Sequence, residues 1–153
     1  MARRIFISYQ HDDQMKAKGF NLLRWNKNVD LEFIGRHLLD PVNSENEAYI
    51  RQKIKEQITG TSVTVVLIGQ NTADSDWVND EVDWSLEKTQ PNGILGIRLE
   101  PGVETPQTLL DCGAEIIDWA PNTFEDAIER AALAAGRAAI AAKGPGGGAS
   151  CHR

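Results

Sequence analysis

The sequence predicts an α/β protein in which helices cover both faces of a parallel β-sheet. Segments typical of strands alternate along the chain with segments typical of helices, which is the pattern of parallel strands joined by crossover helices. One segment, residues 62–68 (Ser-Val-Thr-Val-Val-Leu-Ile), is apolar on both faces, as expected of a strand at the centre of such a sheet. The length of 153 residues suits one domain of this kind.

The first half of the chain supplies two strands and two helices. The run Ile5-Phe6-Ile7 is β-prone, and the polar residues that follow it predict a helix from about Asp13 to Trp25. Alternating apolar residues predict a second strand at 29–33. The S-x-x-E pattern at 44–47 is a capping box, which predicts a helix that ends at Gly60.

The second half continues the alternation after the central strand. We expect a helix from about Ser75 to Thr89, followed by a strand at 94–99 that Pro91-Asn92-Gly93 sets off. A weaker strand is predicted at 114–117. An alanine-rich helix should begin near Asn122 or Thr123 and continue to about Ala142.

Glycine and proline mark the end of the folded domain. The run Gly144-Pro145-Gly146-Gly147-Gly148 is incompatible with regular structure. We therefore expect a domain at 1–143 and a disordered C-terminal tail at 144–153.

The predicted strands define one edge of the sheet as the binding edge. Five strands in an α/β protein favour a flavodoxin-like three-layer sandwich with the order 2-1-3-4-5. Its topological switch lies between the first and third strands, and ligands bind outside the carboxyl ends of such strands. The crevice predicted there is lined, after the first strand, by Ser8, Tyr9, His11 and Asp12 and, after the third, by Gly69, Gln70 and Asn71.

One acidic residue does not fit the pattern of its helix. On a helical wheel of residues 75–89, Glu81 lies between the apolar stripe of Val78 and Val82 and a second stripe with two tryptophans. A carboxylate in a partly apolar recess suffers a desolvation penalty, and a sequence that tolerates this is often using the charge. The simpler alternative is that Glu81 reaches solvent at the edge of the face or pairs with Lys88.

The other candidate residues also have ordinary structural explanations. Trp77 can form the wall of a pocket for a flat ring, but tryptophans on a helix beside a sheet are usually packing residues. Ser8 and Tyr9 are ordinary residues for the end of a strand, and only the position of the crevice favours ligand contact.

Composition excludes several classes of function. The chain has 22 Asp and Glu against 16 Lys and Arg, a net charge of -6 that disfavours nonspecific nucleic-acid binding. The two cysteines and three histidines show no metal-ligand spacing, so we expect no metal site. No run approaches the ~18 apolar residues of a membrane span. We therefore expect an unprocessed cytoplasmic protein without membrane contact.

Several of these segments together resemble a known family. Arg4-Ile5-Phe6-Ile7-Ser8-Tyr9 is similar to the first-strand motif of TIR domains, and Trp77-Val78-Asn79-Asp80-Glu81 to the motif in which a Trp precedes the catalytic Glu by four residues. With Thr61-Ser62-Val63-Thr64-Val65-Val66-Leu67-Ile68-Gly69 and Gly93-Ile94-Leu95-Gly96-Ile97, the resemblance is closest to the TIR-like subunit of the Thoeris antiphage system. It covers about residues 3 to 100.

This resemblance implies a TIR-like fold and an activity. Members of the family consume NAD+, release nicotinamide and make a cyclic ADP-ribose isomer, which a downstream effector with a sensing domain detects. By motif match, Glu81 takes the catalytic position. Ser8, Tyr9 and Trp77, and less closely His11 and Asp12, match the lining of the nucleotide pocket. Self-association often completes such sites.

One segment departs from the common TIR pattern. The loop after the second strand lacks the usual Arg-Asp and Pro-Gly and reads Gly35-Arg36-His37-Leu38-Leu39-Asp40-Pro41. This disfavours an adaptor-type interaction surface, and Thoeris-like members lack that loop as well. No GxGxxG follows the first strand, so NAD+ is expected as the substrate and not as a redox cofactor. For the pyrophosphate, the helix starts near Asp12 and Ser75 offer backbone donors.

The implied reaction needs only one carboxylate. Nicotinamide leaves the ribose as a neutral ring without being protonated, so no general acid is required. The remaining task is to stabilise an oxocarbenium-like ribosyl cation, as in glycoside hydrolysis. An ionised Glu81 that also binds ribose hydroxyls would do this. Whether an internal nucleophile or water then captures the cation, giving a cyclic or a linear product, is left open by the sequence.

Three other functions compete with this interpretation. A noncatalytic TIR interaction module predicts a solvent-facing Glu81 and intact NAD+. A response-regulator receiver needs an Asp after the third strand and a Lys after the fifth, where this chain has Gly69-Gln70-Asn71 and Asp118. A nucleoside deoxyribosyltransferase would use a Glu on a similar scaffold to break a related bond.

Overall fold

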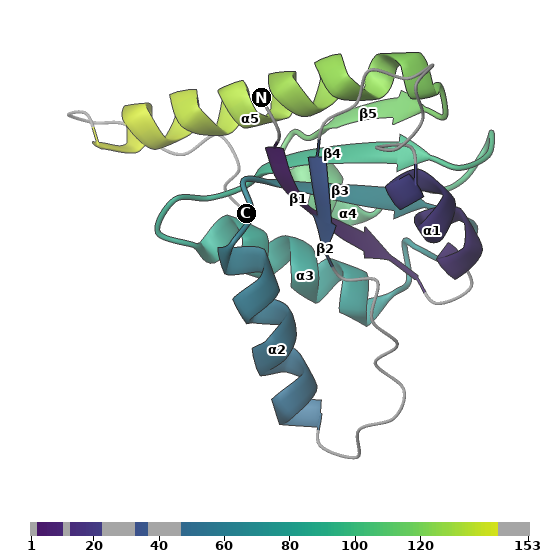
Figure 1. Ribbon diagram of the computed structural model, residues 1–153, viewed down its shortest axis with the longest axis horizontal. Helices are drawn as coiled ribbons and strands as arrows, with labels where there is room; N and C mark the ends of the chain where they lie inside the picture. The colour runs from purple at the N-terminus through teal and green to yellow at the C-terminus, as the bar shows by residue number, and fades with distance from the viewer. Residues whose placement is uncertain (1–2, 11–12, 23–32, 37–46, 144–153) are drawn as a thin grey trace.

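The computed structural model describes residues 3–10, 13–22, 33–36 and 47–143 of the chain (Figure 1). Strands and helices alternate along these residues, as the sequence predicts. Their bounds are β1 Arg3–Tyr9, α1 Gln14–Leu22, β2 Phe33–Arg36, α2 Glu47–Thr59, β3 Val63–Ile68, α3 Asp76–Glu87, β4 Gly93–Arg98, α4 Gln107–Asp111, β5 Glu115–Asp118, the 3-10 turn η4 Pro121–Thr123 and α5 Phe124–Lys143.

The sheet has the predicted topology. Its five strands lie in the order β2-β1-β3-β4-β5, and every neighbouring pair is parallel. β1 and β3 lie side by side at the centre, with Ser8 level with Val66. All six residues of β3 are buried, which explains why this segment is apolar on both faces. The predicted flavodoxin-like order 2-1-3-4-5 is therefore confirmed.

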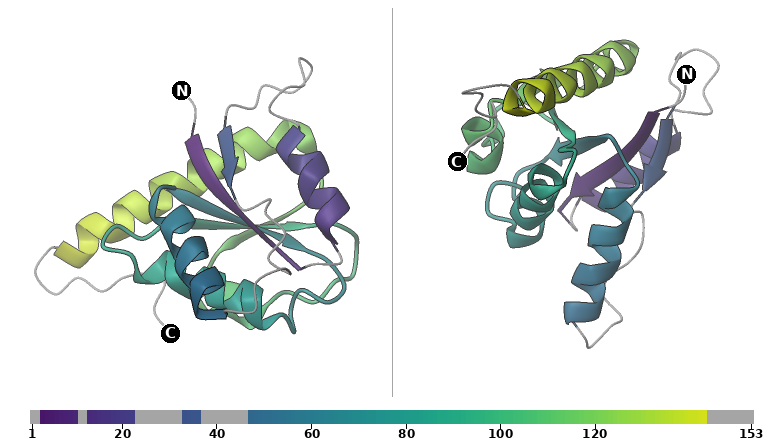
Figure 2. Two further views of the ribbon diagram at one scale, coloured as in Figure 1. Left: turned by 60° about the horizontal axis from the view of Figure 1, so that its bottom comes forward. Right: turned by 90° about the vertical axis from the view of Figure 1, so that its left-hand side faces the viewer.

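Two layers of helices cover the two faces of the sheet (Figure 2). Helices α1 and α5 pack with the side chains that β1, β3 and β4 direct to one face. Helices α2, α3 and α4 cover the other face, where Phe6 and Val66 point. Successive residues of a strand point to opposite faces, so β1 divides its side chains between the two layers. This division decides which residues at the end of β1 can meet α3.

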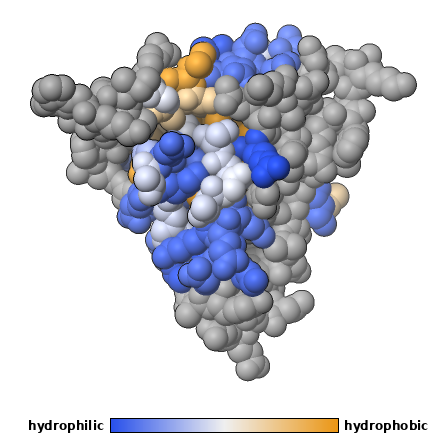
Figure 3. Space-filling view, turned by 60° about the vertical axis from the view of Figure 1, so that its left-hand side comes forward, coloured by the Kyte–Doolittle hydropathy of each residue, from blue (hydrophilic) through white to orange (hydrophobic). Residues whose placement is uncertain are grey.

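Helices α2 and α3 are joined by aromatic and charged side chains. The Arg51 guanidinium lies 4.9 Å from the ring centroid of Trp77 and 5.6 Å from that of Trp84. It also forms an ion pair of 2.8 Å with Asp80. Several polar side chains of α2 are exposed, namely Gln52, Lys53, Lys55 and Glu56, and Figure 3 shows a hydrophilic area in the lower half of the coloured surface. Through its contacts with Trp77, Trp84 and Asp80, Arg51 links α2 to α3, and these four side chains form the seam between the two helices.

Some predicted boundaries differ from the structure. β2 extends from Phe33 to Arg36, beyond the strand predicted at 29–33, because β1 pairs Arg3 with Phe33 and Phe6 with Arg36. Residues 29–32, the loop from 37, the end of the predicted helix 13–25 and the tail 144–153 lie outside the described residues. Helix α2 ends at Thr59, so the predicted stop at Gly60 is confirmed.

One helix was not predicted at all. α4 spans only Gln107–Asp111, with Pro106 at its N-cap. A helix of one and a half turns shows no hydrophobic period, so only the proline marked its start. None of the helices in the described ranges has the length and hydrophobicity needed to cross a membrane.

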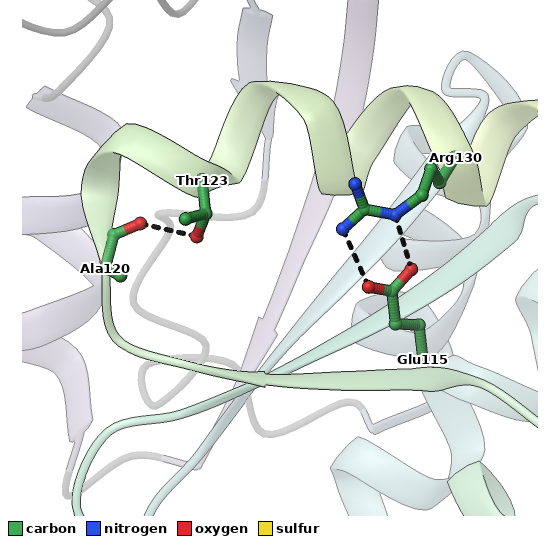
Figure 4. A network of polar contacts seen from close by, with 4 residues as sticks. All are labelled: Glu115, Ala120, Thr123 and Arg130. Carbon is green, nitrogen blue, oxygen red and sulfur yellow. Dashed lines mark hydrogen bonds and ion pairs between the residues drawn. The ribbon is translucent and has the colours of Figure 1, made fainter.

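An ion pair on the surface fastens α5 to the edge strand β5 (Figure 4). Arg130 donates to the two carboxylate oxygens of Glu115 at 3.0 and 2.7 Å. These bonds hold the pKa of Glu115 below its ordinary value of 4.5, although partial burial acts in the opposite direction. Nearby, the Thr123 hydroxyl donates to the Ala120 carbonyl at 2.7 Å and closes the turn before α5.

We expect Glu115→Gln to lower the melting temperature at pH 7 by about 1–3 °C, as is usual for exposed pairs. A lowered carboxyl pKa stabilises the fold above the unfolded pKa, and this stabilisation is lost as the pH falls through the folded pKa. The difference between wild type and variant should therefore shrink below pH ~4.5. Thermal melts across pH measure it, with Glu104→Gln as an exposed control. A difference that is independent of pH would contradict this assignment.

Candidate functional site

A buried serine and a buried glutamate meet at the carboxyl end of β1. Ser8 is the penultimate residue of β1, and the alternation of the strand turns its side chain toward α3. Its hydroxyl donates to Glu81 Oε1 at 2.8 Å. Neither side chain has any exposed surface. Because β1 lies beside β3, the pair is next to the topological switch of the sheet.

The position of Glu81 follows from the faces of α3. Val78, Val82 and Ser85 are fully buried, and Glu81 lies on the same inward side. The helix begins with Ser75, whose hydroxyl accepts a hydrogen bond from the Val78 amide at 3.3 Å. This cap fixes where the helical period begins and therefore which residues face the sheet. Glu81 faces the sheet because the residues beside it on the same face of the helix, Val78, Val82 and Ser85, are buried in the core.

Both ordinary explanations for Glu81 fail in the structure. The carboxylate does not reach solvent, since Glu81 is 0% exposed. Lys88 does not pair with it, because its ammonium donates instead to the carbonyls of Ile58 and Thr61 and to Asn92 Oδ1, at 3.2, 2.6 and 2.5 Å. Burial lowers the pKa of Lys88 from 10.5. The carboxylate of Glu81 is therefore an enclosed group that Ser8 holds from the sheet.

Trp77 lies one turn before Glu81 but belongs to the seam between α2 and α3. The indole is half-buried and packs against Phe6, Ile54 and Ile58. The guanidinium of Arg51 stands over its ring. An aromatic ring covered by a cation and by aliphatic side chains stabilises helix packing. The structure therefore gives Trp77 the packing role that its sequence position left open.

Tyr9 lies on the opposite face of the sheet from Ser8. Its ring is 9% exposed and joins the core that includes Phe20 and Phe124 of the helices on that face. Adjacent residues of a strand cannot point to the same face. The structure therefore places the Tyr9 side chain on the other face of the sheet from the Ser8–Glu81 pair, and a contact between Tyr9 and a substrate stays a prediction.

The loops after β1 and β3 are fastened to each other through Asp13 and Thr72, next to the predicted residue Gly69. Thr72, which is fully buried, accepts a hydrogen bond from the Gly69 amide at 2.8 Å and lies 3.4 Å from Asp13 Oδ2. The Asp13 carboxylate sits so close to Gly69 that a Cβ there would come within 2.4 Å of it. Gln70 and Asn71 expose their side chains at this edge. His11 and Asp12 lie outside the described residues.

Asp13 and Thr72 were missed by the sequence interpretation. The signal that could have found them is the glycine directly after the central strand, because a glycine there often marks a close approach of another group. Helix starts near these loops already carry acidic side chains of the chain itself, Asp13 directly before α1 and Asp76 in the first turn of α3. These helix starts are therefore less suited to a pyrophosphate than the sequence suggested. Across the described ranges, no three His, Cys, Asp or Glu side chains gather as a metal site.

The parallel order with helices on both faces, and a Trp four residues before a buried Glu, define a TIR-like domain. The family model described as "Thoeris protein ThsB, TIR-like domain" matches residues 6–103. The chain belongs to this family of Thoeris TIR-like proteins, which confirms the resemblance in its motifs.

Two further comparisons found similar proteins. It is 30% identical over 104 residues to "Putative cyclic ADP-D-ribose synthase ThsB1" of Bacillus cereus (strain MSX-D12), which covers 65% of this chain and 53% of that protein. The chain thus spans about half the length of this curated relative. The TIR domains of the activated Roq1 resistosome, solved while directly recognising the effector XopQ, match with a TM-score of 0.46 and 14% identity over 90% of this chain and 84% of theirs.

We expect Gly69→Ala to destabilise the protein by about 1–3 kcal/mol, because the new methyl group collides with the Asp13 carboxylate. Removing that carboxylate in the double variant Asp13→Ala, Gly69→Ala should restore part of the loss, which urea unfolding can measure. Gly136→Ala is the matched control, since a Cβ there meets nothing within 4 Å. Additive losses in the double variant would contradict the contact.

Proposed function

We propose that this chain is a TIR-like enzyme that cleaves NAD+ and forms a cyclic ADP-ribose-type signal in Thoeris antiphage defence. Glu81 is its catalytic carboxylate. The observation that carries the proposal is the enclosed Ser8–Glu81 pair at the carboxyl end of β1. The Bacillus cereus relative carries the name "Putative cyclic ADP-D-ribose synthase ThsB1", which supports the same chemistry.

The bond to be broken joins the ribose anomeric carbon to the positively charged nicotinamide nitrogen. The electron pair of this bond leaves with the ring, which becomes neutral and takes no proton. Positive charge then develops on the ribose, and a fixed carboxylate stabilises it more in the transition state than in the substrate. Glu81 therefore needs to be ionised and correctly oriented, but it has no proton to deliver.

Ser8 orients the carboxylate for this task. Its hydroxyl holds Oε1 at 2.8 Å from the rigid strand β1. A carboxylate has about four sites for accepting hydrogen bonds, so ribose hydroxyls can bind it together with Ser8. We therefore assign Ser8 to holding Glu81 as well as to lining the substrate site. Preorganisation of this kind is worth more in a site without water.

The enclosure of the pair favours a cyclic product. Because Ser8 and Glu81 have no exposed surface in the free protein, NAD+ can reach them only when neighbouring groups withdraw. A site that closes again around the substrate excludes water, and a nucleophile of the substrate itself then captures the ribosyl cation. The bond that forms joins this atom to the anomeric carbon; a hydroxyl nucleophile gives up its proton to the Glu81 carboxylate or to solvent in this step, whereas a ring nitrogen has no proton to lose. A trigger or self-association would supply the opening.

The remaining substrate contacts are assigned to the edge of the sheet. Gln70 and Asn71 expose their side chains there, and His11 and Asp12 belong to the loop after β1. We expect Trp77 to act by holding α3 in place next to the substrate. The reaction needs no cofactor besides its substrate NAD+, and the product is read by a separate effector. The cytoplasm, which supplies NAD+, is the proposed location.

We expect Glu81→Gln to lower NAD+ turnover by about 10²–10³ while leaving the melting temperature nearly unchanged. The amide has the same shape and still accepts the hydrogen bond from Ser8, but it carries no negative charge. Chromatography of NAD+ incubated with each protein, at equal concentration and with the Thoeris trigger supplied by infected-cell extract, measures it. Glu87→Gln, an exposed acid of the same helix, is the matched control.

Retained turnover in Glu81→Gln would overturn the assignment of Glu81. Intact NAD+ in the wild type under all these conditions would favour the noncatalytic interaction module instead. That alternative predicts a solvent-facing glutamate, whereas Glu81 is fully buried. Cleavage of nucleosides in place of NAD+ would favour a deoxyribosyltransferase.

A further inference from the structure

A series of buried hydrogen bonds reaches α3 at Ser85, one turn after Glu81, and ends at the backbone carbonyl of Glu81. It begins at the ammonium of Lys88 and continues through Asn92, Thr64 and Ser85. Thr64 and Ser85 are 0% exposed, and Asn92 is 2% exposed. The proposed chemistry uses none of these groups.

The direction of donation along this series is fixed by counting protons. Ser85 Oγ lies 2.8 Å from the Glu81 carbonyl, which can only accept, so the single hydroxyl proton of Ser85 is used there. In the 2.6 Å contact between Thr64 Oγ1 and Ser85 Oγ, Thr64 is therefore the donor. Thr64 Oγ1 in turn accepts from Asn92 Nδ2 at 3.0 Å. Each hydroxyl donates once and accepts once.

A cation stands at the head of the series. Asn92 Oδ1 accepts from Lys88 Nζ at 2.5 Å, and the same ammonium donates to the carbonyl of Ile58 in the last turn of α2 and to that of Thr61 just after this helix. All donors thus point from Lys88 toward Glu81. Hydrogen bonds aligned in series polarise one another, and those with a charged donor are the strongest. The hydrogen bonds in series therefore oppose a movement of Ser85 and of the Glu81 carbonyl to which it donates.

The series and the Ser8–Glu81 bond attach α3 to the sheet at two heights. Ser8 is level with Val66, whereas Thr64 is level with Phe6, two residues earlier along the strands. One helical turn rises about 5.4 Å and two strand residues about 6.6 Å, so the two attachments match when α3 runs antiparallel to the strands. A helix held at one height can slide or rotate about that point. A second attachment one turn away removes this freedom.

We propose that Ser85, supported by Thr64 and Asn92, is a positioning residue for Glu81. It fixes the height and rotation of α3 over the sheet, so that the carboxylate stays in register with Ser8 and with a ribose bound beside it. Ser85 itself does not touch the substrate. The consequence for catalysis rests on the proposed function of Glu81, whereas the consequence for the carboxylate's position does not.

Turnover of NAD+ tests the catalytic part. Ser85→Ala removes one hydroxyl and places a good helix former, and we expect kcat to fall about tenfold with KM nearly unchanged. Thr64→Val should have the same effect, whereas Thr64→Ser, which keeps the hydroxyl, should retain kcat. Ile128→Val, in the core on the other face of the sheet, is the control: it should lower the melting temperature and leave kcat unchanged.

A spectroscopic measurement tests the position of the carboxylate without any turnover. With glutamate labelled by carbon-13 at its side-chain carboxyl, the resonance of Glu81 is identified by its loss in Glu81→Gln. We expect it to move toward the exposed glutamates in Ser85→Ala and Thr64→Val, and to stay in place in Ile128→Val.

A resonance that does not move in Ser85→Ala would overturn the positioning role. A resonance that moves while kcat is retained would overturn its importance for catalysis. If wild-type protein leaves NAD+ intact, the proposed function fails, and the resonance alone still decides whether Ser85 positions the carboxylate.

Discussion

The burial of a carboxylate against a strand is the constraint on which the rest of the structure depends. Glu81 has no exposed surface, and removing a carboxylate from water is costly unless the surroundings supply hydrogen bonds. Ser8 supplies one of them from β1, a neighbour of the central strand β3. To meet it, α3 must present Glu81 inward together with Val78 and Val82, so the register of this helix is set jointly by apolar packing and by a polar contact.

The fold was readable from the sequence where a single physical rule decides the outcome. The buried run of β3, the stop of α2 at Gly60 and the strand order followed from apolar pattern, capping and topology. The short helix α4 was missed because five residues carry no period. The bounds of β2 were predicted from its own alternation, whereas pairing with β1 determines them. Local sequence patterns therefore did not predict a boundary that is determined by pairing with another segment.

For the candidate site, the sequence could be compared with the structure only in where each residue lies. The helical wheel placed Glu81 beside the apolar stripe and left open whether it is buried, which the structure shows it to be. Both Ser8 and Tyr9 were predicted to line the crevice, but the two-residue period of a strand lets only one of these side chains face α3. The fastening of Asp13 to Gly69 and Thr72 depends on how two loops approach each other in space, and no one-dimensional pattern contains that information.

The distance in sequence between Ser8 and Glu81 affects how the protein is made. The two residues are 73 positions apart, so β1 leaves the ribosome long before α3 does. Until α3 docks on the sheet, the carboxylate remains in water and Ser8 has no acid to hold. An unfinished chain therefore contains no assembled site, and whatever the carboxylate does in the cell begins only after most of the domain has been synthesised and folded.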